Sequence, residues 1–192
     1  MRGGLVRMAL AVAFMISVFP MIVRNKATAQ GFHQLTVSDF RGVPKPRMMG
    51  HIAYTNCTID FKYTSYRDKD GTYKLYATVQ LILNRDRCWL DLKKVTSQQM
   101  LNEVLNHEQG HYIIAYMQQQ EILRQVNRTR FTANYTYEAK NLFNTIDAKY
   151  DQLNKDYEAD TGNMQIREQQ HSWDAYFAKR LNTSPPLAQR GY

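Results

Sequence analysis

The segment 95–127 has the hydrophobic periodicity of one long helix, and its apolar stripe contains two histidines. The stripe advances in steps of three and four residues, which is the spacing of one helical face. Its members are Met100, Val104, His107, His111, Ile114 and Met117. Thr96 or Ser97 can cap the helix at its start. Because buried imidazoles need polar partners or a cation, this face restricts what can pack against the helix.

The two histidines frame an HExxH motif, in which Glu108 follows His107 and His111 lies one helical turn later. Residues four apart on a helix differ by about 40° in direction, so both imidazoles can face one ion. The intervening glutamate can then accept a proton from a water at that ion. This arrangement is typical of zinc metallopeptidases. We predict Zn²⁺ as the cofactor, His107 and His111 as its ligands and Glu108 as the catalytic carboxylate.

A catalytic zinc site needs a third protein ligand, and no histidine closely follows His111. Asp160 is our first choice, because it extends the apolar stripe of the next predicted helix. The nearby Glu158 is expected on the surface. Asn163 and His171 are alternative ligands, or groups that stabilise the negative charge of the transition state.

Strand patterns precede the long helix, and two more helices follow it. Alternating residues predict strands over 51–66 and 73–84 around an Asp-Gly turn, with a shorter third strand over 88–92. Helical spacing predicts helices over 137–161 and 164–181. The predicted fold is therefore α+β and zincin-like, with a small N-terminal antiparallel β-sheet packed on the HExxH helix and two C-terminal helices.

Residues 1–29 have the order of a secretory signal peptide, which is a basic start, an apolar run and small residues before a cleavage point. The apolar run falls short of the ~20 residues that a membrane span needs. We predict export to the periplasm or the cell exterior, with no stable membrane insertion once the leader is removed. An uncleaved N-terminal anchor is the alternative.

The remaining chain is long enough for one domain with its own core. That domain is predicted over 30–182, strand-rich over 35–92 and helical over 96–182, with a flexible tail at 183–192. Four of the 25 basic residues lie in the leader, which leaves 21 against 17 acidic residues. This small excess is dispersed along the chain, so we do not expect nucleic acid as a partner.

Cys57 and Cys88 are the two cysteines, and both fall in predicted neighbouring strands. In an exported chain this placement predicts one disulfide bond between them. The histidines His33 and His51 precede the helical half, and we expect them on the surface or in the sheet.

Several segments occur in an order that resembles the bacterial domain of unknown function 922, a family of exported proteins described as zinc-dependent proteases. The segments are "LTVSDFRGVPKP" (35–46), "HIAYTNCTIDFKY" (51–63), "CWLDL" (88–92), "LNHEQGHYIIA" (105–115) and "YEADTGNMQIREQQHSWDAYFAKRL" (157–181). The resemblance implies His107 and His111 as metal ligands and Glu108 as the catalytic carboxylate.

The distal segment of that family usually reads Tyr-Asp-x-Glu-Thr-x-His-Gly. Here Asp160 stands at the glutamate position, while Asn163 and Met164 replace the final His-Gly. Either the acidic residue is the third ligand and is retained, or the histidine is the ligand and is lost. The predicted function is an exported zinc metallopeptidase acting on peptide or protein substrates. The alternative is a zinc-containing periplasmic binding or structural module without catalysis.

Overall fold

The computed structural model describes residues 32–45 and 50–183, and it has an α+β fold with two small antiparallel sheets and three helices in these ranges. The elements in chain order are η1 (Val37–Asp39), β1 (Ala53–Tyr54), β2 (Cys57–Arg67), β3 (Tyr73–Leu83), β4 (Trp89–Leu90), η2 (Leu92–Lys94), α1 (Gln98–Arg128), α2 (Tyr135–Thr161) and α3 (Arg167–Thr183). The α+β prediction is confirmed. The predicted signal peptide and residues 184–192 of the predicted tail lie outside the described residues.

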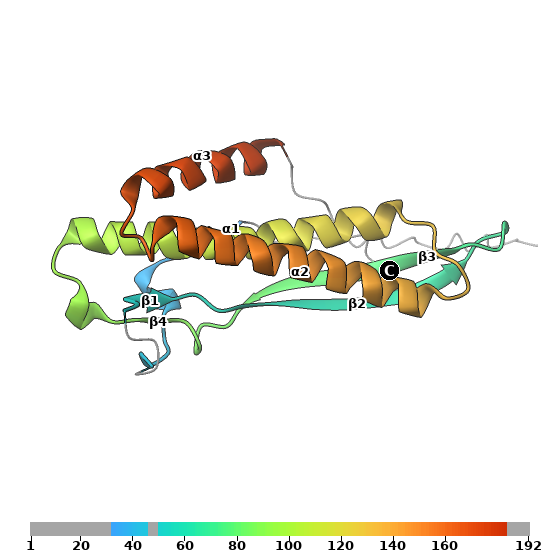
Figure 1. The fold of residues 1–192 in the computed structure, drawn as a ribbon. Helices are drawn as coiled ribbons and strands as arrows, with labels where there is room; N and C mark the ends of the chain where they lie inside the picture. Colours follow the sequence, from blue (N-terminus) through green and yellow to red (C-terminus); the bar gives the residue numbers. More distant parts are fainter. Residues whose placement is uncertain (1–31, 46–49, 184–192) are drawn as a thin grey trace, which may run out of the picture.

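Helix α1 lies at the centre of the molecule. The β2–β3 hairpin runs along one side of α1 and α2, and α3 lies on the opposite side (Figure 1). The apolar core lies between these layers and includes Val79, Ile122, Phe131, Tyr157 and Phe177. The HExxH helix is therefore covered on several sides and not only along one stripe.

Buried glutamines connect α1 to β3, to α2 and to the N-terminal segment. Gln119 donates to the backbone carbonyl of Val79 in β3 at 2.9 Å, and Gln118 donates to Asp147 of α2 at 2.9 Å. Gln109 accepts from the backbone N–H of Leu35 at 2.7 Å, which ties the N-terminal segment to the motif. Because buried amides must be hydrogen-bonded, these side chains fix the position of α1 among its neighbours.

The hairpin follows the predicted alternation of the two long strands. β2 and β3 pair antiparallel from Cys57 with Leu83 to Arg67 with Tyr73, and alternate residues of β3 are buried. The predicted third strand is present as β4, but it pairs with β1 in a separate sheet. The turn after β3 accounts for this correction, because the backbone N–H groups of Arg87 and Cys88 bond back to the carbonyl of Asn84 and redirect the chain.

Helix α2 ends at a glycine, as the sequence predicted. Gly162 has φ of 53°, the left-handed conformation that favours glycine after a helix. Asn163 and Met164 continue in that region, with φ of 53° and 67°. Within 32–45 and 50–183, no helix combines the length and the hydrophobicity needed to cross a membrane.

Gly110 lets α1 and α2 approach closely beside the motif. A methyl group on Gly110 would overlap the phenol ring of Tyr157. Tyr157 cannot easily retreat, because it is fully buried and its hydroxyl donates to the His107 carbonyl at 2.9 Å. The glycine of the HExxH sequence is therefore required by packing.

Replacing Gly110 with alanine should lower the free energy of unfolding by about 1–3 kcal/mol, since overpacking outweighs the better helix propensity of alanine. Thermal unfolding followed by circular dichroism would measure the effect as a drop of at least about 3 °C. Gln99→Ala, on an exposed turn of the same helix, is the control. An unchanged or higher unfolding temperature for Gly110→Ala would contradict the packing argument.

Candidate metal centre

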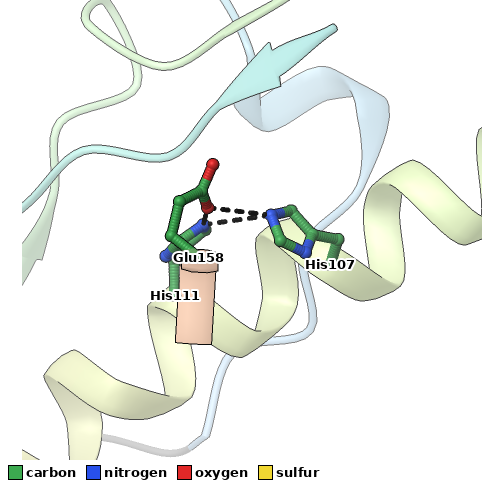
Figure 2. A group of neighbouring side chains, drawn as sticks. All are labelled: His107, His111 and Glu158. Atoms are coloured by element: carbon green, nitrogen blue, oxygen red, sulfur yellow. Dashed lines mark hydrogen bonds and ion pairs between the residues drawn. The ribbon is translucent and has the colours of Figure 1, made fainter. Parts of the chain in front are cut away.

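Two imidazoles and one carboxylate converge between α1 and α2. The Nε2 atoms of His107 and His111 lie 3.3 Å apart, and the Oε2 atom of Glu158 lies 3.2 Å from the first and 3.1 Å from the second (Figure 2). These three residues form a group that could hold a metal ion. The histidines come from consecutive turns of α1, and the glutamate comes from the last two turns of α2.

The protonation of His107 follows from its neighbour on α3. Gln170 directs its Nε2 group to the Asp174 carboxylate at 2.9 Å, and a carboxylate can only accept there. Its Oε1 atom therefore faces His107 Nδ1 at 3.1 Å and accepts a hydrogen bond from it. Since neutral imidazole carries one proton, Nε2 of His107 presents a lone pair to the group.

His111 has an equivalent partner on α2. Its Nδ1 atom donates to Oδ1 of Asn154 at 2.7 Å, which leaves Nε2 unprotonated in the neutral ring. Two lone pairs and a carboxylate oxygen thus meet with no proton between them. Such an arrangement is repulsive unless a cation joins them, so the chemistry of the donor set fits a metal ion.

The electrostatics of the three residues also favour a cation. Burial alone would raise the pKa of Glu158, but the neighbouring imidazoles of His107 and His111 outweigh burial and hold that pKa well below its usual range. Burial alone would lower the pKa of His111, but the contact with Glu158 outweighs it and raises that pKa. Both shifts indicate a site where positive charge is stabilised.

The spacing fits a tetrahedral ion of the size of zinc. Ligand atoms about 2.0–2.1 Å from a tetrahedral zinc ion are about 3.3 Å from one another. The three separations of 3.1–3.3 Å agree with that value. Three protein ligands also leave one tetrahedral position for a water or a substrate, as in catalytic zinc sites.

Glu108 lies beside this group in a cavity of about 430 Å³. It is 3% exposed, and its Oε2 atom has no hydrogen-bond partner among the described residues. The cavity is bounded by α1, α2 and the segment 51–57, and it also contains the three residues of the metal-binding group. A buried carboxylate with one oxygen free of hydrogen bonds, next to a group that could hold a cation, is suited to accept a proton.

Residues 27–165 match the family described as "Bacterial protein of unknown function (DUF922)", which is more than half of the chain. The chain belongs to the DUF922 family. The matched span includes α1, α2 and all three residues of the metal-binding group, and it ends before α3. Comparison with curated proteins and with solved structures gives no significant match.

In this DUF922 member the structure groups Glu158, and not the predicted Asp160, with the two imidazoles. Asp160 is exposed and accepts a hydrogen bond from Trp173 Nε1 at 3.1 Å, away from the two imidazoles. Glu158 lies two residues earlier, about 200° around the helix from Asp160, on the side that faces α1. The sequence did contain a signal for Glu158: Asn154 and Glu158 are four residues apart, like the two histidines, and therefore lie on one face of α2.

The other predicted polar residues are divided between the cavity and the surface. Asn163 lines the cavity but is not part of the three-residue group. His171, predicted as an alternative ligand or stabilising group, is exposed on α3 and does not line the cavity. His51 does line it, with Nδ1 3.6 Å from Glu158 Oε1, and the sequence argument missed this role. His33 instead bonds to the buried Asp39 at 3.0 Å.

The predicted disulfide is absent, because Cys57 and Cys88 are both free thiols. The Cys88 sulfur accepts from the backbone N–H of Asn56 at 3.2 Å and contacts its carbonyl at 3.6 Å. Cys57 instead lines the cavity, where burial raises its pKa to about 12, with smaller contributions from Cys88 and Glu108. The strands bring the cysteines near each other, but the Cys88 thiol bonds to the backbone.

Proposed function

We propose that the protein is an exported zinc-dependent metallopeptidase that hydrolyses peptide bonds in its cavity. The observation that carries the proposal is the convergence of His107 Nε2, His111 Nε2 and Glu158 Oε2 at tetrahedral spacing, beside the unpartnered Oε2 atom of Glu108. The order of basic, apolar and small residues in the leader supports export.

A zinc ion in this group would supply Lewis acidity and make a water more acidic. The protein residues divide the remaining tasks. Glu108 accepts the proton of the attacking water and delivers it to the leaving amine. His51 and Asn163 line the same cavity and can donate hydrogen bonds to the carbonyl oxygen as it becomes negative.

Elemental analysis and a hydrolysis assay on the purified chain test this function. We expect about one zinc per chain, and hydrolysis of an unfolded protein substrate that stops with a chelator and returns with zinc. A wild-type chain that is folded and free of metal after exposure to zinc would contradict the proposal.

A non-catalytic zinc-containing module is the second candidate, and one observation favours it. Asn163 and Met164 depart from the His-Gly expected in the distal segment, and both line the cavity. Because Glu158 completes the group that could hold a metal ion, these departures need not remove a ligand. If the protein is such a module, we expect stoichiometric zinc without hydrolysis. Elemental analysis and the hydrolysis assay together distinguish this outcome from a peptidase.

Gln170 should affect zinc affinity without touching the ion. Gln170→Leu removes the acceptor that orients His107, and we expect zinc affinity to fall about 10- to 100-fold. Competition with a chromophoric chelator would measure the change. Gln169→Leu, exposed on the same helix, is the matched control. Equal affinities for the two variants would show that Gln170 does not orient the ligand.

A further inference from the structure

The cavity beside the metal centre has a charge opposite to that of the chain. The chain has 25 Lys and Arg residues against 17 Asp and Glu residues. Among the described residues, however, those that line the cavity include four carboxylates and neither lysine nor arginine. The carboxylates are Glu108, Asp147, Asp151 and Glu158.

Two of these carboxylates lie at a distance from the reacting centre. Asp147 and Asp151 occupy successive turns of α2, eleven and seven residues before Glu158 respectively. At 1.5 Å per residue, Asp147 is about 16 Å and Asp151 about 10 Å from Glu158 along the helix axis. An extended peptide advances about 3.3 Å per residue, so this end of the cavity is three to five residues from the metal centre.

The negative charge of Asp147 and Asp151 is only partly compensated within the protein. A dication at the metal centre would be offset by Glu158 and Glu108, and not by these two residues. Asp147 accepts a hydrogen bond from the neutral amide of Gln118. Asp151 pairs with Lys155 on the surface, where both side chains are more than 60% exposed. Such an exposed pair contributes little and exchanges readily.

A separate observation, on the side of the cavity formed by residues 51–57, favours a polar ligand in the cavity. Thr55 is 9% exposed and lines the cavity, and its Oγ1 atom has no hydrogen-bond partner among the described residues. Its neighbouring strand β1 pairs with β4 on one side only in the described structure. A buried hydroxyl without a partner is costly, and a chain lying in the cavity could supply that partner.

We propose that the protein selects peptides with a basic side chain, held by Asp147 and Asp151 three to five residues from the reacting peptide bond. This proposal rests on the proposed peptidase function and adds the class of substrate to it. A lysine or arginine side chain there gains two carboxylate partners, while an acidic side chain is repelled.

Binding of peptide pools to the full chain carrying Glu108→Gln tests the proposal without turnover. The probes are end-blocked octapeptides of Ala, Ser and Gly with two lysines, two glutamines or two glutamates at random positions. We expect the lysine pool to bind about tenfold more tightly than the glutamine pool at low salt, with the preference weakening as salt rises. Adding Asp147→Asn and Asp151→Asn should remove the preference for the lysine pool. Asp156→Asn is the control and should keep that preference, because Asp156 is exposed on α2 outside the cavity.

Equal binding of the lysine and glutamine pools, no binding of any pool, or a lysine preference that survives the double substitution would overturn the proposal. Zinc content and hydrolysis of the wild-type chain are measured separately. Hydrolysis without a lysine preference contradicts only the basic-substrate proposal. A lysine preference without hydrolysis contradicts the peptidase function and leaves the acidic subsite in place.

Discussion

Replacing Glu158 with glutamine is expected to remove zinc from the protein after dialysis. The substitution keeps the shape of the side chain but removes the charged donor that lies 3.1–3.2 Å from both imidazoles. The loss of affinity should exceed the roughly 10- to 100-fold expected when a ligand loses only its hydrogen-bond partner. Elemental analysis and chelator competition would measure it, with circular dichroism to verify that the variant is folded.

Asp160→Asn is the control, because Asp160 is the third ligand that the sequence predicted and Glu158 is the one that the structure places beside the histidines. Asp160 bonds to Trp173, so its substitution should leave zinc content unchanged and affect stability by about 1 kcal/mol. The opposite pattern, with zinc lost from Asp160→Asn and kept by Glu158→Gln, would reject Glu158 as the third ligand.

Glu108→Gln should reduce hydrolysis by about 10²- to 10⁴-fold while leaving zinc content unchanged, because an amide cannot accept the proton of the attacking water. The variant should also remain folded, since Glu108 Oε2 has no hydrogen-bond partner to lose among the described residues. Initial rates on an unfolded protein substrate, compared at equal zinc content, would measure the effect.

Glu103→Gln on the same helix is the matched control for this substitution. Glu103 pairs with Arg167 outside the cavity, so its loss should leave the rate near that of the wild type. If Glu108→Gln and the wild type hydrolyse the substrate at equal rates, Glu108 is not the proton acceptor. If neither hydrolyses it while both bind zinc, the non-catalytic module is favoured.

The central helix and the histidine pair could be predicted because they depend on local spacing. Two residues four apart share a helical face whatever packs against it, and Ser97 caps the helix as a sequence signal indicates. The alternation of the hairpin strands is equally local. These parts of the fold needed no information about distant contacts.

The third donor could not be predicted because it depends on how α2 is rotated against α1. Glu158 and Asp160 lie about 200° apart around the helix, so the choice between them depends entirely on which side of α2 faces α1. Helix α2 contacts both α1 and α3, and its apolar stripe does not show which side faces the histidines. The disulfide was wrong for a similar reason, because strand proximity does not fix where each sulfur points.

The burial of α1 on several sides has a consequence for how a substrate reaches the site. Amide hydrogens in the most enclosed element of a fold exchange with solvent only when much of the protein opens. Helix α1 is that element here, and it carries both histidines and Glu108. Any motion that admits a peptide must therefore occur in the walls, which are the segment 51–57 and α2. Helix α1 then keeps its geometry, while the segment 51–57 and α2 adjust to the substrate.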